Sequence, residues 1–176
     1  MNNFVLVLTI AIGAVTLSGC ELFRSPKIGN CTESWTTEND MFRIRVNKHA
    51  EENGGYVGGA YFIFQSAPKG QENWANIMIF RHDDPVEIPR EQVRFVCERI
   101  GYVFIGNKFA VTADGGITWS IWDAIKNLPN WSHTRASIKD VQIEATGDGL
   151  MELYSFTKQK AHDLRTKDFG KSWDIQ

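Results

Sequence analysis

The strongest constraint on the fold is a short motif that occurs twice in the second half of the chain. The pattern T-x-D-x-G-x-[T/S]-W spans residues 112–119 and 166–173, and each copy follows an apolar run. The aspartate can accept backbone N–H bonds across a tight turn, the glycine permits a positive φ, and the tryptophan packs over the turn. The motif therefore predicts two similar structural hairpins, built by Thr112, Asp114, Gly116, Thr118 and Trp119 and by Thr166, Asp168, Gly170, Ser172 and Trp173.

Short runs rich in aromatic and β-branched residues predict β-strands along most of the chain. Turn-forming glycine, asparagine, aspartate and proline residues separate them, a spacing typical of all-β proteins with antiparallel sheets. A single short helix is predicted near Ser120–Asn127. The predicted strands are Met41–Val46, Tyr56–Gln65, Trp74–Arg81, Val93–Arg99, Tyr102–Ile105, Lys108–Thr112, Val141–Ala145, Leu150–Phe156 and His162–Thr166.

The repeated motif resembles the Asp-box of sialidases and many other β-propellers, where it is structural and lies away from the substrate site. The resemblance implies an all-β fold, either partly propeller-like or a sandwich-like stack, because the chain has room for only about two to three blades. A sialidase would need an arginine cluster. Phe42-Arg43-Ile44 is similar to the first part of one, but Arg45 stands where proline should follow. Strand alternation instead places Arg43 and Arg45 on one solvated face.

The first twenty residues carry no charged side chain and are apolar from Phe4 to about Leu17. This run suits a signal peptide better than a transmembrane span of roughly 20 residues. It closes on Leu17-Ser18-Gly19-Cys20, which resembles the bacterial lipobox; an ordinary cleaved signal that happens to end in cysteine is the alternative. We expect a signal peptide over residues 1–19, lipidated Cys20 and a tether over residues 20–34, and one β-rich domain over residues 35–176. By resemblance to Gram-negative sorting, Glu21 favours the periplasmic face of the outer membrane.

Charge and cysteine content narrow the class of protein further. The chain has 19 basic and 21 acidic side chains, and no two lysines or arginines are adjacent, so a nucleic-acid footprint is absent. In an oxidising periplasm, Cys31 and Cys97 are expected to form a disulfide, with a buried reduced pair as the alternative.

Motifs that carry catalysis or bind metal are missing from the sequence. G-x-S-x-G, P-loop and H-E-x-x-H patterns do not occur, and the four histidines lack metal-ligand spacing. His82-Asp83-Asp84, which precedes Pro85, is interpreted as a polar turn. We therefore expect no enzyme, cofactor or metal, although all-β active sites can assemble from distant residues.

Two tryptophans are candidates for contacts with a partner. Trp122 and Trp131 flank a loop that contains Leu128-Pro129-Asn130. Aromatic side chains on loops are typical binding anchors, and the alternative is that both close one end of the β core.

The order of lipobox, early cysteine, Val93–Cys97 and the first Asp-box is similar to small immunity lipoproteins of type VI secretion (Tli-type). Such proteins partner with phospholipase effectors of the Tle type. The resemblance implies a lipid-anchored periplasmic inhibitor whose partners are a cognate toxic lipase and, through the anchor, the membrane. Alternatives are an envelope scaffold lipoprotein and a glycan-binding protein related to sialidases.

Overall fold

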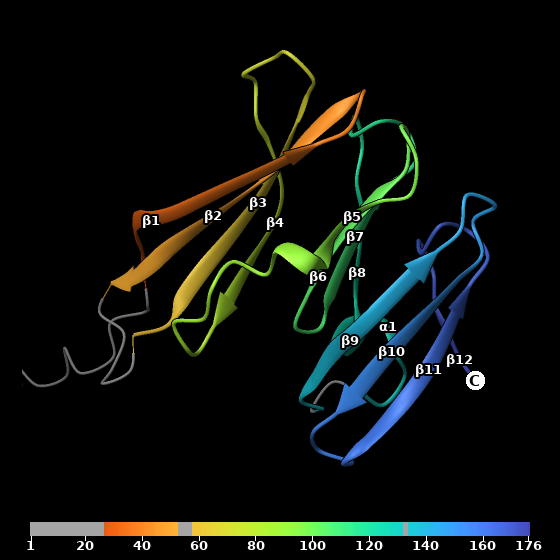
Figure 1. The fold of residues 1–176 in the computed structure, drawn as a ribbon. Coiled ribbons are helices and arrows are strands. Elements are labelled where there is room, and N and C mark those ends of the chain that lie inside the picture. Colours follow the sequence, from red (N-terminus) through yellow and green to blue (C-terminus); the bar gives the residue numbers. More distant parts are fainter. Residues whose placement is uncertain (1–26, 53–57, 132–133) are drawn as a thin grey trace, which may run out of the picture.

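The computed structural model describes residues 27–52, 58–131 and 134–176, so the predicted signal peptide and Cys20 lie outside the described residues. The fold is all-β and consists of three four-stranded antiparallel sheets, A, B and C, which follow one another along the chain (Figure 1). Each sheet is a meander in which consecutive strands pair. Four-stranded sheets are the units of β-propellers, but a closed propeller typically has four to eight of them.

The strand bounds are as follows. Sheet A contains β1 (Lys27–Glu38), β2 (Phe42–Glu52), β3 (Ala60–Pro68) and β4 (Ala75–His82). Sheet B contains β5 (Val93–Phe95), β6 (Gly101–Ile105), β7 (Lys108–Thr112) and β8 (Ser120–Asp123). Sheet C contains β9 (Ala136–Ile143), β10 (Gly149–Ser155), β11 (Lys160–Thr166) and β12 (Asp174–Ile175). A 3-10 turn, η1 (Arg90–Gln92), precedes β5, and one helical turn, α1 (Ala124–Asn127), follows β8.

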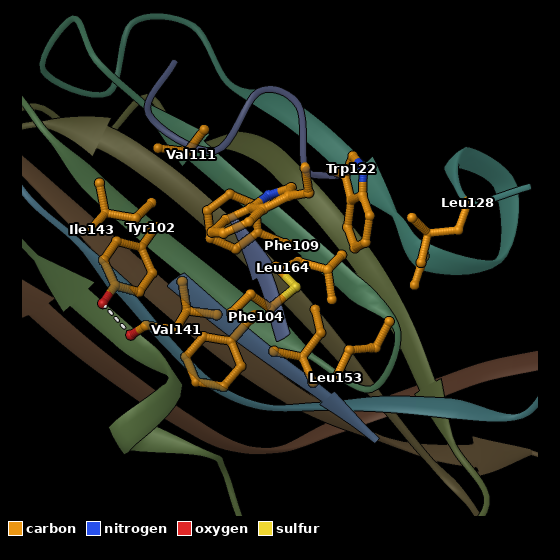
Figure 2. Packing of buried hydrophobic residues seen from close by; sticks show 14 of the residues in the cluster. Tyr102, Phe104, Phe109, Val111, Trp122, Leu128, Val141, Ile143, Leu153 and Leu164 are labelled. Carbon is orange, nitrogen blue, oxygen red and sulfur yellow. Dashed lines mark hydrogen bonds between the residues drawn. The ribbon is translucent and has the colours of Figure 1, made fainter. Parts of the chain in front are cut away.

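Sheet B is the middle layer and contributes side chains to two apolar clusters. Every residue of β6 is buried, and the strand period of two sends alternate side chains to opposite faces. Val103 and Ile105 pack in the cluster shared with sheet A, whereas Tyr102 and Phe104 pack in the cluster shared with sheet C. Figure 2 shows the second cluster, in which the Tyr102 hydroxyl donates to the Val141 carbonyl oxygen at 2.8 Å.

The Asp-box hairpin of sheet B joins β7 to β8. Asp114 accepts backbone N–H bonds from Ile117 at 3.1 Å and Thr118 at 2.9 Å, and it also accepts the hydroxyl hydrogens of Thr112 and Thr118. The Thr112 hydroxyl oxygen in turn accepts the Gly116 N–H at 2.9 Å. Burial opposes ionisation of Asp114, but these hydrogen bonds outweigh it and lower the pKa of the carboxyl group.

The hairpin of sheet C joins β11 to β12 and repeats this arrangement. Asp168 accepts from the Ser172 N–H at 3.0 Å and from the hydroxyls of Ser172 and Thr166 at 2.7 Å each. Thr166 accepts the Gly170 N–H at 2.9 Å. Burial again opposes ionisation, yet the hydrogen bonds hold the pKa of Asp168 below its usual range. The predicted hairpins are therefore present, with φ of +83° at Gly116 and +84° at Gly170.

The N-terminal boundary of the domain differs from the prediction. Residues 27–34, expected to belong to the tether, form the first two thirds of β1, which pairs with β2 through two register irregularities. The strand is polar and exposed along most of its length, so hydrophobic alternation gives no sign of it. Backbone pairing with β2 holds the strand, and Trp35 near its end packs against the apolar cluster of sheets A and B.

Other element bounds shift for local reasons. The run Val93–Arg99 forms strand only to Phe95, because the N–H groups of Val96 and Cys97 turn back to the Ile100 carbonyl oxygen. The segment Ser120–Asn127 is half strand and half helix: Asp123 caps α1 by accepting the Ile125 N–H at 3.0 Å.

The predicted disulfide is wrong in this structure, since Cys31 and Cys97 are both free and exposed. Cys97 lies beside the β1–β2 turn, where its carbonyl oxygen accepts from Asn39 Nδ2 at 3.1 Å. Cys31 stands eight residues back along β1, which corresponds to about 26 Å of extended chain. A disulfide needs Cα atoms within about 7 Å of each other.

Candidate functional site

Trp122 and Trp131 are core residues and not exposed anchors. They are 3% and 2% exposed and belong to the cluster between sheets B and C. Figure 2 shows Trp122 beside Leu128 and facing the buried side chains of the two sheets. The structure thus favours the alternative in which they close one end of the core.

A groove of about 740 Å³ lies at the end of the sheet stack opposite the two Asp-box hairpins. All three sheets contribute to it: the end of β4 and the loop after it, the β6–β7 turn, α1, residues 134–137 at the start of β9, and Phe156 just after β10. The groove was not predicted, because its residues are scattered along the chain and meet only when the sheets stack.

The β6–β7 turn and α1 form an ordered base for the groove. Asn107 Nδ2 donates to Asp123 Oδ1 at 2.6 Å, and Asn127 Oδ1 accepts the Asp123 N–H at 2.9 Å. Gly106 has a φ of +55°, and a Cβ there would come within 2.2 Å of the Phe80 ring. Phe80 therefore lies directly against the backbone of the turn, which only glycine permits.

An arginine at the end of β4 is held by two carboxylates. Arg81 Nε and Nη2 donate to Glu51 at 2.6 and 3.0 Å, and Arg81 Nη1 donates to Asp83. The Glu51 side chain is only 1% exposed and also accepts the Gly59 N–H at 3.1 Å. Hydrogen bonds from Arg81 lower the pKa of Glu51, and the same bonds raise the pKa of Arg81. Arg81 therefore stays charged and in one orientation at the edge of the groove.

The predicted polar turn at His82-Asp83-Asp84 is present and lines the groove. His82 Nδ1 accepts the Asp84 N–H at 3.0 Å, so the turn itself engages the imidazole. Across the groove, the Arg135 side chain makes no ion pair with any described residue. Val86 and Phe156, which are 38% and 51% exposed, add apolar surface.

This arrangement combines fixed charges, exposed apolar side chains and an ordered base. Within residues 27–52, 58–131 and 134–176, no three His, Cys, Asp or Glu side chains are grouped to hold a metal ion. The same residues include no helix long and apolar enough to cross a membrane. Chemically, the groove is suited to bind a protruding polypeptide segment through ion pairs and apolar contact.

Comparison with known proteins gives no relative: no protein-family model, curated protein or solved structure matches the chain.

Proposed function

We propose that this protein is a lipid-anchored periplasmic immunity protein that binds and neutralises a type VI secretion phospholipase effector. The observation that carries the proposal is the groove formed jointly by the three sheets, with Val86 and Phe156 exposed beside fixed charges. Exposed apolar side chains beside charged ones are typical of protein-binding sites. The lipobox-like segment and the Asp-box support the assignment through the resemblance to Tli-type lipoproteins.

The proposed mechanism is occlusion of the lipase. A protruding segment of the effector enters the groove, and the bulk of the sheet stack then blocks its active site or its approach to the membrane. The anchor at Cys20 holds the inhibitor at the surface where a lipase acts, which raises its effective concentration without new contacts. Arg135, which has no ion pair with a described residue, and the acidic turn at Asp83-Asp84 allow ion pairs with charges of either sign.

The test is titration of the full-length chain, in mild detergent, with the product of the neighbouring gene, followed by a lipase assay of that product. Phe156→Asp places a charge at the apolar side of the groove and should weaken binding by about tenfold or more, because buried apolar anchors carry much of interface energy. Ile117→Asp is the matched control. Ile117 is 77% exposed at the opposite end of the stack, so this variant should bind the lipase with the affinity of the wild-type chain.

Three outcomes of this titration distinguish the immunity function from the scaffold function. Tight binding with loss of lipase activity, sensitive to Phe156→Asp alone, supports the proposal. Capture of the lipase with full retention of its activity favours the scaffold function. Absence of binding by the wild-type chain contradicts the proposal.

A further inference from the structure

A second distinctive surface lies on the outer face of sheet A, the face turned away from sheet B. Arg43 and Arg45 of β2 both gather around Trp74, which precedes β4. Their guanidinium carbons lie 4.8 and 4.1 Å from the indole ring centroid. Sequence alternation correctly predicted one shared strand face for the two arginines, but the residues are half-buried and not freely solvated.

The cluster has far more hydrogen-bond donors than acceptors. Two guanidinium groups carry ten N–H donors. Their acceptors among the described residues are three oxygen atoms, from Gln71, Glu72 and Gln65. Arg43 Nε is buried without any partner, a costly state for a polar group.

The two arginines of the cluster also differ in their ion pairs. Arg43 pairs with Glu72 at 3.0 Å, but the Glu72 side chain is 79% exposed and contributes little. Arg45 makes no ion pair with any described residue and donates only to the neutral Gln65 Oε1, at 3.1 and 2.8 Å. Arg45 is therefore a half-buried guanidinium that has no salt-bridge partner among the described residues.

A row of hydrogen-bonded side chains orders this face across all four strands. Ser34 donates to Asn47 at 2.7 Å, Asn47 to Gln65 at 3.0 Å, and Gln65 to Asn76 at 2.9 Å. Gln65 Oε1 also accepts hydrogen bonds from Arg45, so the row holds the Arg45 guanidinium in place before any ligand binds. Such preorganisation reduces the entropy lost on binding.

Apolar side chains adjoin the row. Ile63 and Ile79 are direct cross-strand partners beside it, and Ile79 is 40% exposed. The next cross-strand partners on this face, two residues further along β3 and β4, are Tyr61 and Arg81, and Arg81 lies at the edge of the groove. Hot spots of protein–protein interfaces are enriched in arginine and tryptophan, and this face combines both with apolar residues.

We propose that the Arg43–Arg45–Trp74 cluster is a carboxylate-binding anchor that takes an acidic side chain of a protein partner. Gln65 occupies the Nε–Nη2 edge of the Arg45 guanidinium, and a carboxylate matches the remaining Nη1–Nη2 edge, where it supplies the salt-bridge partner that Arg45 lacks among the described residues. If the partner is the lipase effector, this identification rests on the proposed function, and the interface then runs from the groove past Arg81 onto sheet A.

The first test does not need the effector. A capped hexaglutamate peptide is titrated into the full-length chain in detergent, and the Arg45 Nε and Trp74 Nε1 resonances are followed by NMR. Arg45→Gln should weaken peptide binding about tenfold, the expected worth of a charge-assisted pair. Arg45→Lys keeps the charge but loses the fork, and should recover only part of the affinity. Lys69→Gln removes one charge from the same end of the sheet, outside the cluster, and should bind within about twofold of wild type.

Equal affinity of wild type and Arg45→Gln for the peptide overturns the proposal, as does no binding to either. Equally strong saturation by inorganic phosphate, or an Arg45-dependent preference for phosphatidylglycerol vesicles over phosphatidylcholine vesicles without peptide binding, also overturns it.

The effector titration separates the two proposals. Effector binding that Arg45→Gln does not weaken contradicts the effector as the acidic partner while leaving the proposed function intact. No effector binding by wild type, together with Arg45-dependent peptide binding, contradicts the proposed function and leaves the anchor standing.

Discussion

The two Asp-box hairpins have nearly the same internal hydrogen bonds, but they attach differently to the preceding sheet. In sheet B, Trp119 packs edge-on against Phe42 of sheet A, and its indole N–H donates to Ser66 at 2.9 Å. In sheet C, Trp173 packs edge-on against Phe109 of sheet B, and its indole N–H is buried without a partner. Both hairpin tryptophans therefore pack edge-on against a phenylalanine of the preceding sheet, whereas an indole hydrogen bond to that sheet, the polar link from Trp119 to Ser66, is present among the described residues only at the first hairpin.

A third hairpin extends the comparison. The β3–β4 hairpin of sheet A has Gly70 at the fifth motif position, with a φ of +77°, and Ser66 in place of threonine at the first. Pro68 replaces the aspartate and Trp74 is displaced by one residue. No sheet precedes sheet A among the described residues, so this hairpin has no preceding sheet against which its tryptophan could pack.

The largest expected effect comes from filling the space between a hairpin glycine and the phenylalanine it contacts. A Cβ would come within 2.8 Å of Phe42 at Gly116 and within 2.6 Å of Phe109 at Gly170. Gly116→Ala and Gly170→Ala should each lower the free energy of unfolding by about 2–4 kcal/mol, through crowding and the positive φ together. Gly70→Ala, with nothing within 4 Å, should lose only about 1 kcal/mol. Urea unfolding measures the stability of all three variants. Equal losses of free energy of unfolding would contradict the importance of the close contact between the hairpin glycine and the phenylalanine of the preceding sheet.

Removing the carboxylates tests the internal bonds of the hairpins. Asp114→Ala removes the charged acceptor of two backbone N–H groups and should lower the free energy of unfolding in urea by about 2–3 kcal/mol. Asp168→Ala removes the charged acceptor of one backbone N–H group, that of Ser172, and should lower the free energy of unfolding by less, about 1–2 kcal/mol. A larger loss at Asp168 would show that the hydrogen-bond count does not set the difference.

Acid should weaken both hairpins together. The pKa values of Asp114 and Asp168 are lowered in the folded state, so the stabilisation is complete above the unfolded value of about 3.9 and is lost as pH falls through the folded values. The melting temperature should therefore decline below about pH 4. The double variant Asp114→Asn/Asp168→Asn should show a flatter decline, and an unchanged pH profile would assign the acid sensitivity to other groups.

The smallest effect concerns the polar link. Ser66→Ala leaves Trp119 Nε1 without its acceptor and should cost about 1 kcal/mol. A double-mutant cycle with Trp119→Phe should give a coupling of about 0.5–1 kcal/mol in urea unfolding. Zero coupling would mean that the two tryptophan contacts are equivalent, and that the Trp119–Ser66 hydrogen bond contributes nothing beyond packing.

The sequence predicted what local patterns encode. The two hairpins follow from the spacing of Asp114 and Asp168 with their neighbours, and the strand at Lys108–Thr112 has the predicted bounds. By contrast, the aromatic residue Trp131 gives the same signal in a loop anchor as in a core, and only its burial in the stack distinguishes the two. β1 was missed because an exposed edge strand needs no alternation, and the Arg45–Trp74 contact depends on pairing across β2, β3 and β4 that no local pattern encodes.

Sheet B supplies residues to both apolar clusters, which has a consequence for how the molecule unfolds. Opening sheet A or sheet C exposes one cluster, so either end can fray while the other cluster stays packed. Opening sheet B exposes both clusters at once. The stability of sheet B therefore determines whether unfolding is a single cooperative event. The chain thus resembles a short linear array, in which neighbour-to-neighbour coupling through the middle unit sets the cooperativity of the whole.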